Sequence, residues 1–544
     1  MNGPFLLAAT QLNISHLDLV IILVYLLLII GMGFYVSYKQ KQTVNSYFLA
    51  GRSLKWTTIG LSLFATNIST VHLIGLAADG YRVGLVVGNF ECLAAFTLIM
   101  LGLVFAPIYH RSGVVTLPDF LEQRYSAGSR IMLAIMGVVA ALFIHIGMTL
   151  YAGSTILHEF FGIDVFTSVL VISAITTLYT VMGGLKAVVI TESIQTVLLI
   201  IGSFAVTWFA VGALNEQGIN SFSELRAALP EQHMSMIQEN GGFSWYAFVL
   251  GYPVLGIWYW CSDQTIVQRV LGAQAERDAQ IGPLFAGFIK ILPLMIMVFP
   301  GVLAYVLFQD QIGENPNRAL PVLINKLITE DLMGLKGLIA AGLLAALMST
   351  IAGALNSTAT LISIDVVKKL KPETSDAKLV VAGRITAIVV MILAIGWSTM
   401  GSKFESIFSG LNSMIACLAP PITVVFIWGV LWPRGTAKAS LVTLIAGSVL
   451  GGLTFALDFG FGLITNELGI PFMLQAWWLF VICSVIFVAV SLMTPPPAND
   501  QIEMMCWKHP LKEIIFRKLS GVTDPRLIAL LLAIIMSCVY ITFA

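Results

Sequence analysis

The stretch "FATNISTVHLIG", Phe64–Gly75, decides how the chain around it is interpreted. It lies inside an apolar segment that runs from about Trp56 to Ala78. Its polar side chains crowd together at Thr66, Asn67, Ser69, Thr70 and His72. A helix in lipid tolerates single Ser or Thr residues, but irregular backbone survives at membrane depth only beside a cavity or site. The density of polar residues therefore predicts an interrupted helix that forms a binding site inside a membrane.

The composition agrees with a membrane location. Of the 544 residues, 58% are hydrophobic and 11% are charged, whereas a soluble domain carries about 25% charged residues. The formal net charge of +0 gives no bulk attraction to nucleic acid. The six cysteines lack metal-binding spacing and are interpreted as small hydrophobic residues. The sequence shows no catalytic triad pattern, phosphate loop or metal cluster, so it does not indicate an enzyme.

Apolar runs of roughly 20 residues, the length that crosses a bilayer, recur along the whole chain. They predict an all-α polytopic membrane protein with about 14 transmembrane helices. We expect these helices near residues 17–37, 56–78, 83–108, 131–153, 163–182, 187–213, 244–262, 283–308, 335–366, 378–400, 406–431, 439–457, 473–493 and 526–543.

Basic residues are concentrated after the odd-numbered spans, for example at Arg111, Arg269 and Lys368. Loops rich in Lys and Arg stay on the cytoplasmic side of a membrane. Every odd span is therefore predicted to run from outside to inside, and both termini are predicted to be external. We expect the protein in a cell membrane, either a plasma membrane or a bacterial inner membrane.

Two loops carry patterns of their own. In the external loop 214–243, Ser221 and Glu224 form a capping-box pattern that predicts a short surface helix. The internal loop 494–525 mixes aromatic, apolar and basic residues, so it is predicted to lie on the membrane surface. Neither loop is long enough to form a separate catalytic domain.

Several polar residues fall inside predicted spans. Glu91 lies in the third span, Glu192 in the sixth and Lys290 in the eighth. An ionisable group at this depth indicates a functional site, although a structural ion pair is the alternative explanation. His145 is interpreted as an interior histidine that neighbouring groups satisfy.

Two further patterns indicate what the site binds. Ser349 and Thr350 are adjacent hydroxyls near the middle of the ninth span. With carbonyls freed by a broken helix, they offer the oxygen ligands that a sodium ion needs. Tyr259 and Trp260 precede Gln264. Such aromatic residues usually form an interfacial belt. Next to amides they can also bind a hydroxylated ring, because the flat aromatic face contacts its C–H groups and the amides bond its hydroxyls.

Four longer stretches resemble the solute:sodium symporter family, and most of all its sodium/glucose cotransporter branch. They are "YFLAGRSLKWTTIGLSLFATNIS" (47–69), "LYTVMGGLKAVVITESIQT" (178–196), "WYWCSDQTIVQR" (258–269) and "LNSTATLISIDV" (355–366). The resemblance runs from about Leu17 to Pro433 and continues more loosely to the end.

This resemblance implies a LeuT-type fold, in which two five-helix inverted repeats form the core. The whole chain would be one transporter domain with a peripheral first helix, 17–37. The first repeat would be 56–213 and the second 244–431, with C-terminal peripheral helices in 439–544.

The resemblance also implies which residues bind each ligand. Sodium would be held by carbonyls or hydroxyls of Ala65, Ile68, Ala346, Ser349 and Thr350. The positions that match the family's sugar site are Asn67, His72, Glu91, Tyr259, Trp260, Lys290 and Asn412. The outer gate would comprise Leu76, Phe90 and Phe408, and Tyr259 would form the inner gate.

Three residues depart from the family pattern. Asn412 stands where sugar-transporting relatives have glutamine, which leaves the identity of the sugar open. Glu192 replaces the usual aspartate, and Ala352 lacks the hydroxyl that two-sodium members use. Both changes argue against a complete second sodium site, and the region around Glu192 is where a second ion would bind.

The leading hypothesis is a sodium-coupled symporter that imports a neutral hexose or related polyol by alternating access, with one sodium ion per solute. The alternative is a sodium symporter of the same fold that transports another small solute, namely an inositol, an amino acid or a carboxylate. A channel or a membrane sensor fits less well, because gating aromatics favour occlusion and no signalling domain is evident. The expected partners are sodium, a small solute and the lipid bilayer, and the sequence indicates no obligatory protein partner.

Overall fold

The computed structural model describes residues 14–544 except 40–42, 240, 330, 331, 333, 400–406, 510 and 517. This part of the chain is helical and contains no β-strand, only an isolated bridge between Leu54 and Ala273. The first helices are α1 (His16–Lys39), α2 (Val44–Leu49), α3 (Trp56–Asn67), α4 (Thr70–Val83), α5 (Asn89–Met100), α6 (Ala106–Ser112), α7 (Leu117–Arg124), α8 (Ala127–Ala140), α9 (Thr149–Phe161), α10 (Val165–Glu216) and α11 (Phe222–Ala227).

The later helices continue the bundle to the end of the chain. They are α12 (Trp245–Ile257), α13 (Gln264–Leu271), α14 (Glu276–Ile289), α15 (Phe299–Ile312), α16 (Ala319–Leu327), α17 (Leu335–Thr360), α18 (Lys368–Leu370), α19 (Asp376–Ser398), α20 (Ile407–Leu431), α21 (Ala437–Phe461), α22 (Phe472–Met493), α23 (Asn499–Glu503) and α24 (Pro525–Thr542).

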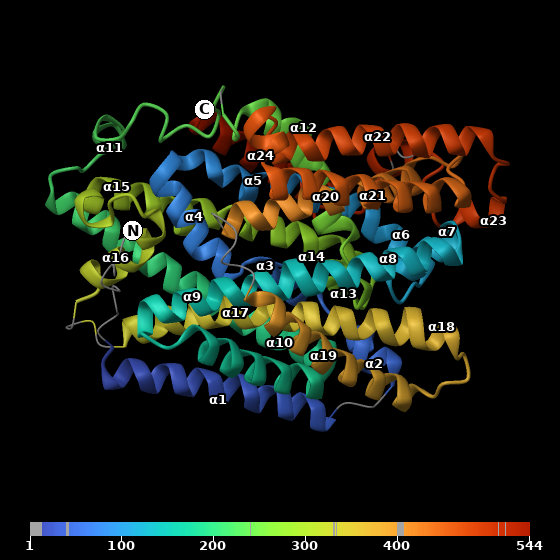
Figure 1. The fold of residues 1–544 in the computed structure, drawn as a ribbon, viewed down its shortest axis with the longest axis horizontal. Helices are drawn as coiled ribbons and strands as arrows, with labels where there is room; N and C mark the ends of the chain where they lie inside the picture. Colours follow the sequence, from blue (N-terminus) through green and yellow to red (C-terminus); the bar gives the residue numbers. More distant parts are fainter. Residues whose placement is uncertain are drawn as a thin grey trace.

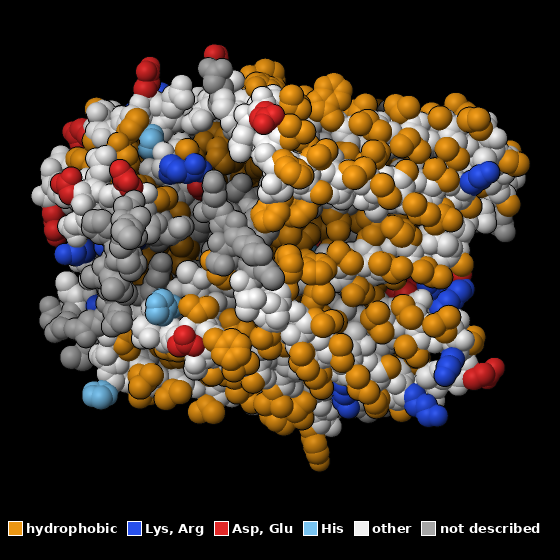
Figure 2. Space-filling model, in the orientation of Figure 1, with side chains coloured by type: hydrophobic (Ala, Val, Ile, Leu, Met, Phe, Trp, Pro, Cys, Tyr) orange, Lys and Arg blue, Asp and Glu red, His pale blue; other side chains and the backbone are white. Residues whose placement is uncertain are grey.

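Eleven helical stretches among the described residues are long and apolar enough to cross a membrane. The long helices run side by side (Figure 1), and hydrophobic side chains cover the middle of the molecule (Figure 2). Acidic side chains gather mostly at the end that carries α11 and α16, whereas Lys and Arg dominate the end that carries α7 and α18. The predicted all-α polytopic membrane fold is therefore confirmed.

The eleven stretches do not confirm the predicted number of fourteen spans. Helix α10 holds two of those spans in one helical run, although its backbone leaves the helical region at Gly184 (φ 55°, ψ −160°). Helix α3 has only 12 residues and is too short to cross a bilayer alone. Because the helix breaks within these stretches, the number of spans predicted from hydropathy differs from the number of long continuous helices.

The interruption predicted within Phe64–Gly75 lies between α3 and α4. Ile68 ends α3 with extended backbone angles, and Ser69, also extended, caps α4. The Ser69 side chain accepts from the third residue of α4, and the side chain of that residue, His72, accepts from the Ser69 backbone. This reciprocal cap stabilises the start of α4 and so fixes the break at membrane depth.

Helix α17 forms the centre of the bundle. In its apolar 18-residue stretch 89% of the residues are buried, whereas 28% are buried in the corresponding stretches of α21 and α22. Helices α10, α19 and α1 pack against α17, so the small residues along α17 face protein rather than lipid. Asp18 of α1 accepts the Gly337 N–H at 2.7 Å, which attaches the first helix to the start of α17.

The predicted surface helix is present as α11. The side chain of its cap residue Ser221 accepts from the Glu224 N–H, and the Glu224 carboxylate accepts from the Ser221 N–H at 3.0 Å. The following segment is bonded to the end of the chain, where the Met236 N–H donates to the Phe543 carbonyl at 2.7 Å. Helix α1 begins at this same end of the molecule (Figure 1).

Candidate functional site

A large cavity opens at the acidic end of the molecule. Its volume is about 1330 Å³, and its wall includes Thr70 and Val71 of α4 and Ser413 of α20. Polar residues surround its mouth, among them the ion pair of Asp79 with Arg82 at 2.8 Å. The cavity therefore reaches the start of α4, next to the α3–α4 break.

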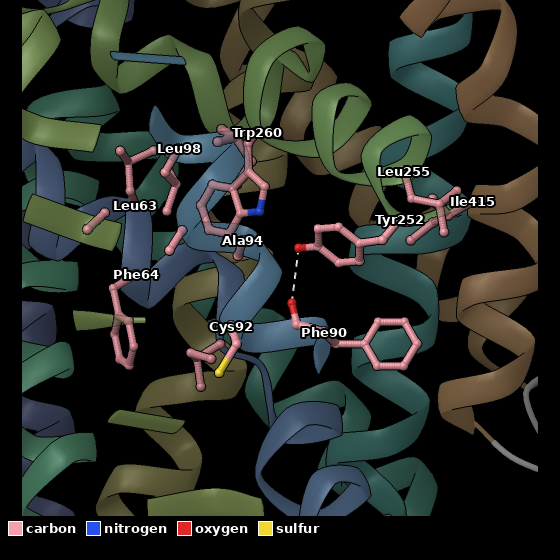
Figure 3. Packing of buried hydrophobic residues seen from close by; sticks show 14 of the residues in the cluster. Leu63, Phe64, Phe90, Cys92, Ala94, Leu98, Tyr252, Leu255, Trp260 and Ile415 are labelled. Carbon is pink, nitrogen blue, oxygen red and sulfur yellow. Dashed lines mark hydrogen bonds between the residues drawn. The ribbon is translucent and has the colours of Figure 1, made fainter. Parts of the chain in front are cut away.

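Aromatic side chains form one wall of the cavity near Phe90. The Phe90 ring stacks on Phe472 with centroids 6.3 Å apart and meets Phe243 edge-on at 6.1 Å, and both partners line the cavity. The Tyr252 hydroxyl donates to the Phe90 carbonyl at 3.0 Å, as Figure 3 shows. Of the predicted outer-gate residues, Leu76 is buried, and the side chain of Phe408 lies outside the described set.

A charged cluster lies deeper than this aromatic wall. The Lys290 ammonium contacts the Glu91 carboxylate and lies 2.5 Å from the Asn67 side-chain oxygen. It also lies 5.6 Å from the centroid of the Trp260 ring. All four side chains are buried, with at most 8% exposure. The structure thus brings together four of the predicted solute-binding residues, which come from α3, from α5, from the C-terminal cap of α14 and from the π-helical turn after α12.

The other predicted solute-binding residues surround this cluster less closely. Tyr259 meets the Trp260 ring edge-on at 5.1 Å and is partly exposed. His72 is engaged in the α4 cap, with its Nδ1 3.1 Å from the Ser69 hydroxyl. Asn412 is buried on α20, between Gly410 and Ser413 on the cavity wall.

Oxygen atoms from α3 and α17 converge at the predicted sodium site. The Ser349 hydroxyl lies 2.8 Å from the Ala65 carbonyl and 3.1 Å from the Ala346 carbonyl. The Thr350 hydroxyl lies 2.9 Å from the carbonyl of Thr66, a residue that the sequence did not place in this site. Such uncharged oxygens, set at a helix break, suit a monovalent cation better than a divalent one.

A buried ion pair lies beside these oxygens. Glu192 accepts from Arg269 at 2.7 Å and from Thr66 at 2.9 Å, and it also contacts Ser62. Both charged side chains are fully buried. Sequence reasoning had counted Arg269 among the basic residues of an internal loop, but the structure places it inside the bundle. A Cβ atom at Gly353 would lie 2.6 Å from the Arg269 guanidinium, so the small residue makes room for it.

His145 has a charged partner that its local sequence did not reveal. Its Nε2 lies 2.6 Å from the Asp263 carboxylate, and its ring stacks on Trp258 with centroids 6.2 Å apart. Asp263 caps α13 by accepting from the Thr265 N–H at 2.7 Å. The histidine is a satisfied interior residue, as predicted, and it supports the turn that carries Tyr259.

The arrangement combines an open cavity that has an aromatic wall with a buried site of mixed hydrogen-bond donors and acceptors. A search of the described residues finds no group of His, Cys, Asp and Glu that would hold a metal ion. The charged side chains of Glu91, Lys290, Glu192 and Arg269 are paired, and the oxygens of the predicted sodium site are neutral hydroxyls and carbonyls. These features suit the binding and passage of a small solute with a monovalent cation.

Comparison with known proteins identifies the class. The model of the Sodium:solute symporter family matches residues 47–447. The chain belongs to this family, and it is therefore a sodium-coupled transporter and not an enzyme.

Its relatives include cotransporters for two kinds of solute. The chain is 31% identical over 540 residues to the sodium/glucose cotransporter 1 of Ovis aries, covering 90% of this chain and 80% of the relative. It is 33% identical over 540 residues to the sodium/myo-inositol cotransporter of Homo sapiens, covering 89% and 74%.

A solved structure confirms the fold. The outward-open, substrate-bound Na⁺-coupled sialic acid symporter superposes with a TM-score of 0.77 at 20% identity, covering 89% of this chain and 99% of that one. The LeuT-type fold that the sequence resemblance implied is thereby established.

Proposed function

We propose that this symporter imports a neutral, polyhydroxylated ring such as a hexose. The observation that carries the proposal is the cluster of Glu91, Lys290 and Asn67 beside Trp260. Sugar hydroxyls both donate and accept, and this cluster offers an acceptor carboxylate, a donor ammonium and an amide with both capacities. The flat face of Trp260 takes the C–H groups of a ring.

The charge balance of the cluster favours a neutral cargo. Glu91 and Lys290 neutralise each other, so an anionic solute would meet the carboxylate and a cationic solute would meet the ammonium. Separating a buried ion pair to receive a charged solute costs several kcal/mol. A hydroxylated ring exchanges hydrogen bonds with both groups and leaves the pair intact.

We further propose that one sodium ion accompanies each solute. The ion would be held by Ser349, Thr350 and the carbonyls of Ala65, Ile68 and Ala346. In the region where a second ion would bind, the Arg269 guanidinium contacts Glu192 and supplies a positive charge of its own. Ala352 adds no hydroxyl there.

The distribution of charge supports an orientation in the membrane. Because basic side chains dominate the end that carries α7 and α18, we assign that end to the cytoplasm, and both termini to the outside. The cavity then faces outward, with Leu76, Phe90 and Phe408 as its gate and Tyr259 as the gate below the solute. We assign the inverted repeats to 56–213 and 244–431, within a cell membrane.

An inositol is the second candidate cargo. The chain is 33% identical to the sodium/myo-inositol cotransporter of Homo sapiens and 31% identical to the sodium/glucose cotransporter 1 of Ovis aries, so the two kinds of relative are about equally similar. Asn412, which is one methylene shorter than the glutamine of sugar-transporting relatives, leaves the identity of the ring open. An amino acid or carboxylate cargo would have to compensate for the charges of Glu91 and Lys290.

Uptake into proteoliposomes distinguishes these cargoes. Labelled glucose, galactose, myo-inositol, an amino acid and a carboxylate are compared under an inward sodium gradient and under a choline gradient. We expect sodium-dependent uptake of at least one neutral polyhydroxylated ring and none of the charged solutes. Sodium-dependent uptake of a carboxylate alone would refute the proposed cargo while leaving sodium coupling intact.

A further inference from the structure

At the end of the molecule opposite the cavity, the start of α7 joins two other elements. The Leu117 N–H donates to Oε1 of Gln264 in α13 at 2.8 Å. The Thr116 hydroxyl donates to Oδ1 of Asp365 at 2.8 Å. Asp365 lies in the π-helical turn Leu361–Val367 that follows α17. Two neighbouring residues therefore connect α13 to the end of α17.

A charge network reinforces this junction. Arg130 of α8 donates from Nε to Oδ1 of Asp365 at 2.8 Å and from Nη1 to Glu122 at 2.6 Å. Lys369 contacts Glu122 from the other side. We call Thr116, Leu117, Gln264, Asp365 and Arg130 the inner clasp, and each of these side chains is at most 8% exposed.

The inner clasp holds two polar atoms that have no hydrogen-bond partner among the described residues. They are Nε2 of Gln264 and Oδ2 of Asp365, the second polar atoms of the two side chains that bond α7. A buried polar atom without a partner is costly, because it loses its bonds to water. This cost is removed in a conformation in which water or a leaving solute reaches both atoms.

The space between the proposed solute site and the inner clasp is nearly filled. A void of about 10 Å³ lies there, lined by Leu117 and Gln264 of the clasp and by Trp258, Ser262 and Asp263 beside Tyr259. Such a void holds about one water molecule at most. The passage is thus closed at this end while the cavity of about 1330 Å³ is open at the other.

We propose that the inner clasp is the cytoplasmic gate of the transport path. In the closed state, Thr116 and Leu117 hold α13 against the turn after α17. When they release Gln264 and Asp365, the two side chains line the opened path and bond the leaving solute and water. The inference rests on alternating access in this family, and it does not depend on which solute is carried.

The test measures access to the void from each side of the membrane. Ser262→Cys, a conservative change at a residue that is 2% exposed, reports access when a membrane-impermeant thiol reagent is applied to reconstituted full-length protein. Thr116→Val removes the hydroxyl that bonds Asp365, and Thr116→Ser retains it. We expect the labelling rate from the cytoplasmic side to rise roughly tenfold or more in Thr116→Val and to stay unchanged in Thr116→Ser.

A second pair of variants covers the case in which Thr116→Val does not fold. Gln264→Met removes the acceptor of the Leu117 N–H, and Gln274→Met changes an exposed glutamine near the same end. Only Gln264→Met is expected to raise cytoplasmic labelling. Equal rates in both members of each pair would overturn the proposal, and so would a rise from both sides, which indicates a loosened fold. Protein without Ser262→Cys gives the background, because the native cysteines remain.

Discussion

Lys290 shows how single residues of this protein keep charge inside a membrane. Its ammonium contacts Glu91 and Asn67 and faces the Trp260 ring. Removing one partner of a buried ion pair costs about 3–5 kcal/mol, because the other charge is left uncompensated. A substitution that is meant to report on solute binding must therefore keep the shape and hydrogen bonding of the side chain it replaces.

Glu91→Gln keeps the shape and much of the hydrogen bonding of the side chain, although it leaves the Lys290 ammonium without its anionic partner, and it tests the solute site. The amide keeps the size of the carboxylate but accepts weaker hydrogen bonds, so we expect solute affinity to fall about ten- to hundredfold, which corresponds to 1.5–3 kcal/mol. Sodium binding without solute is expected to persist. The measurement is the solute concentration for half-maximal uptake. Glu224→Gln, on the exposed helix α11, is the matched control. An unchanged solute affinity in Glu91→Gln would mean that the solute does not bind at Glu91.

Thr350→Ala tests the sodium site. The hydroxyl lies between two carbonyls, those of Thr66 and Ala346, and its loss removes one neutral ligand from the ion. We expect the sodium concentration for half-maximal uptake to rise about ten- to hundredfold. Thr350→Ser keeps the oxygen and is expected to retain near-normal sodium dependence. If the alanine and serine variants respond alike, Thr350 does not bind the ion.

The residues of the site were predictable to different degrees. Glu91 and Lys290 stand out because ionisable groups are rare within apolar runs. Arg269 does not stand out, because it follows a predicted span and its position in the sequence indicates a loop residue. The structure instead pairs it with Glu192. Thr66 contributes through its backbone carbonyl, which no sequence pattern singles out.

The elements depend on a few positions where the backbone leaves helical geometry. Gly184 is one of them, because it combines a φ of 55° with close contact to Tyr47. An added Cβ would lie 2.6 Å from the Tyr47 carbonyl oxygen. Both the backbone angle and the contact therefore require glycine at this turn.

Gly184→Ala is expected to destabilise the protein by about 1–3 kcal/mol, as non-glycine residues in rare backbone regions do. The thermal unfolding midpoint of the purified protein measures the effect. Gly212→Ala, in the same α10 run with open space around its Cβ, is the control and is expected to be neutral or slightly stabilising. Equal midpoints for the two variants would contradict the role assigned to Gly184.

The sequence predicted most elements because their signals are local. The break between α3 and α4 follows from crowded polar residues, and α11 follows from the spacing of Ser221 and Glu224. The number of fourteen spans is not confirmed, because the spans predicted at 163–182 and 187–213 lie in one helical run, although the break at Gly184 falls between them. The LeuT-type fold was implied by the family resemblance and not by local patterns.

At the scale of the whole molecule, the buried charges bear on the coupling ratio, which is the number of sodium ions transported with each solute. With Arg269 neutralising Glu192, we expect one sodium ion per solute. One ion is sufficient, because 100 mV and a tenfold sodium gradient together give about 3.7 kcal/mol, enough for a several-hundredfold solute gradient.

Reversal potentials in proteoliposomes, recorded at several sodium and solute gradients, measure this ratio. We expect the reversal potential to change with the sodium and solute gradients with the slope of one charge transported per solute. A slope for two charges would mean that Glu192 binds a second ion despite Arg269. Because the measurement needs only a transported solute, it separates the coupling ratio from the identity of the sugar.

The open cavity makes the transport cycle sensitive to osmotic pressure. A space of about 1330 Å³ holds about forty water molecules at roughly 30 Å³ each, and closing the outer gate must expel much of this water. An osmolyte too large to enter draws water out and so favours the closed form. The product of osmotic pressure and cavity volume gives about a twofold shift at the osmotic pressure of an ideal 1 M solution. We expect dextran or a large polyethylene glycol, added outside, to slow labelling of a cysteine in the cavity by this factor. Glycerol, which enters the cavity, is expected to have little effect.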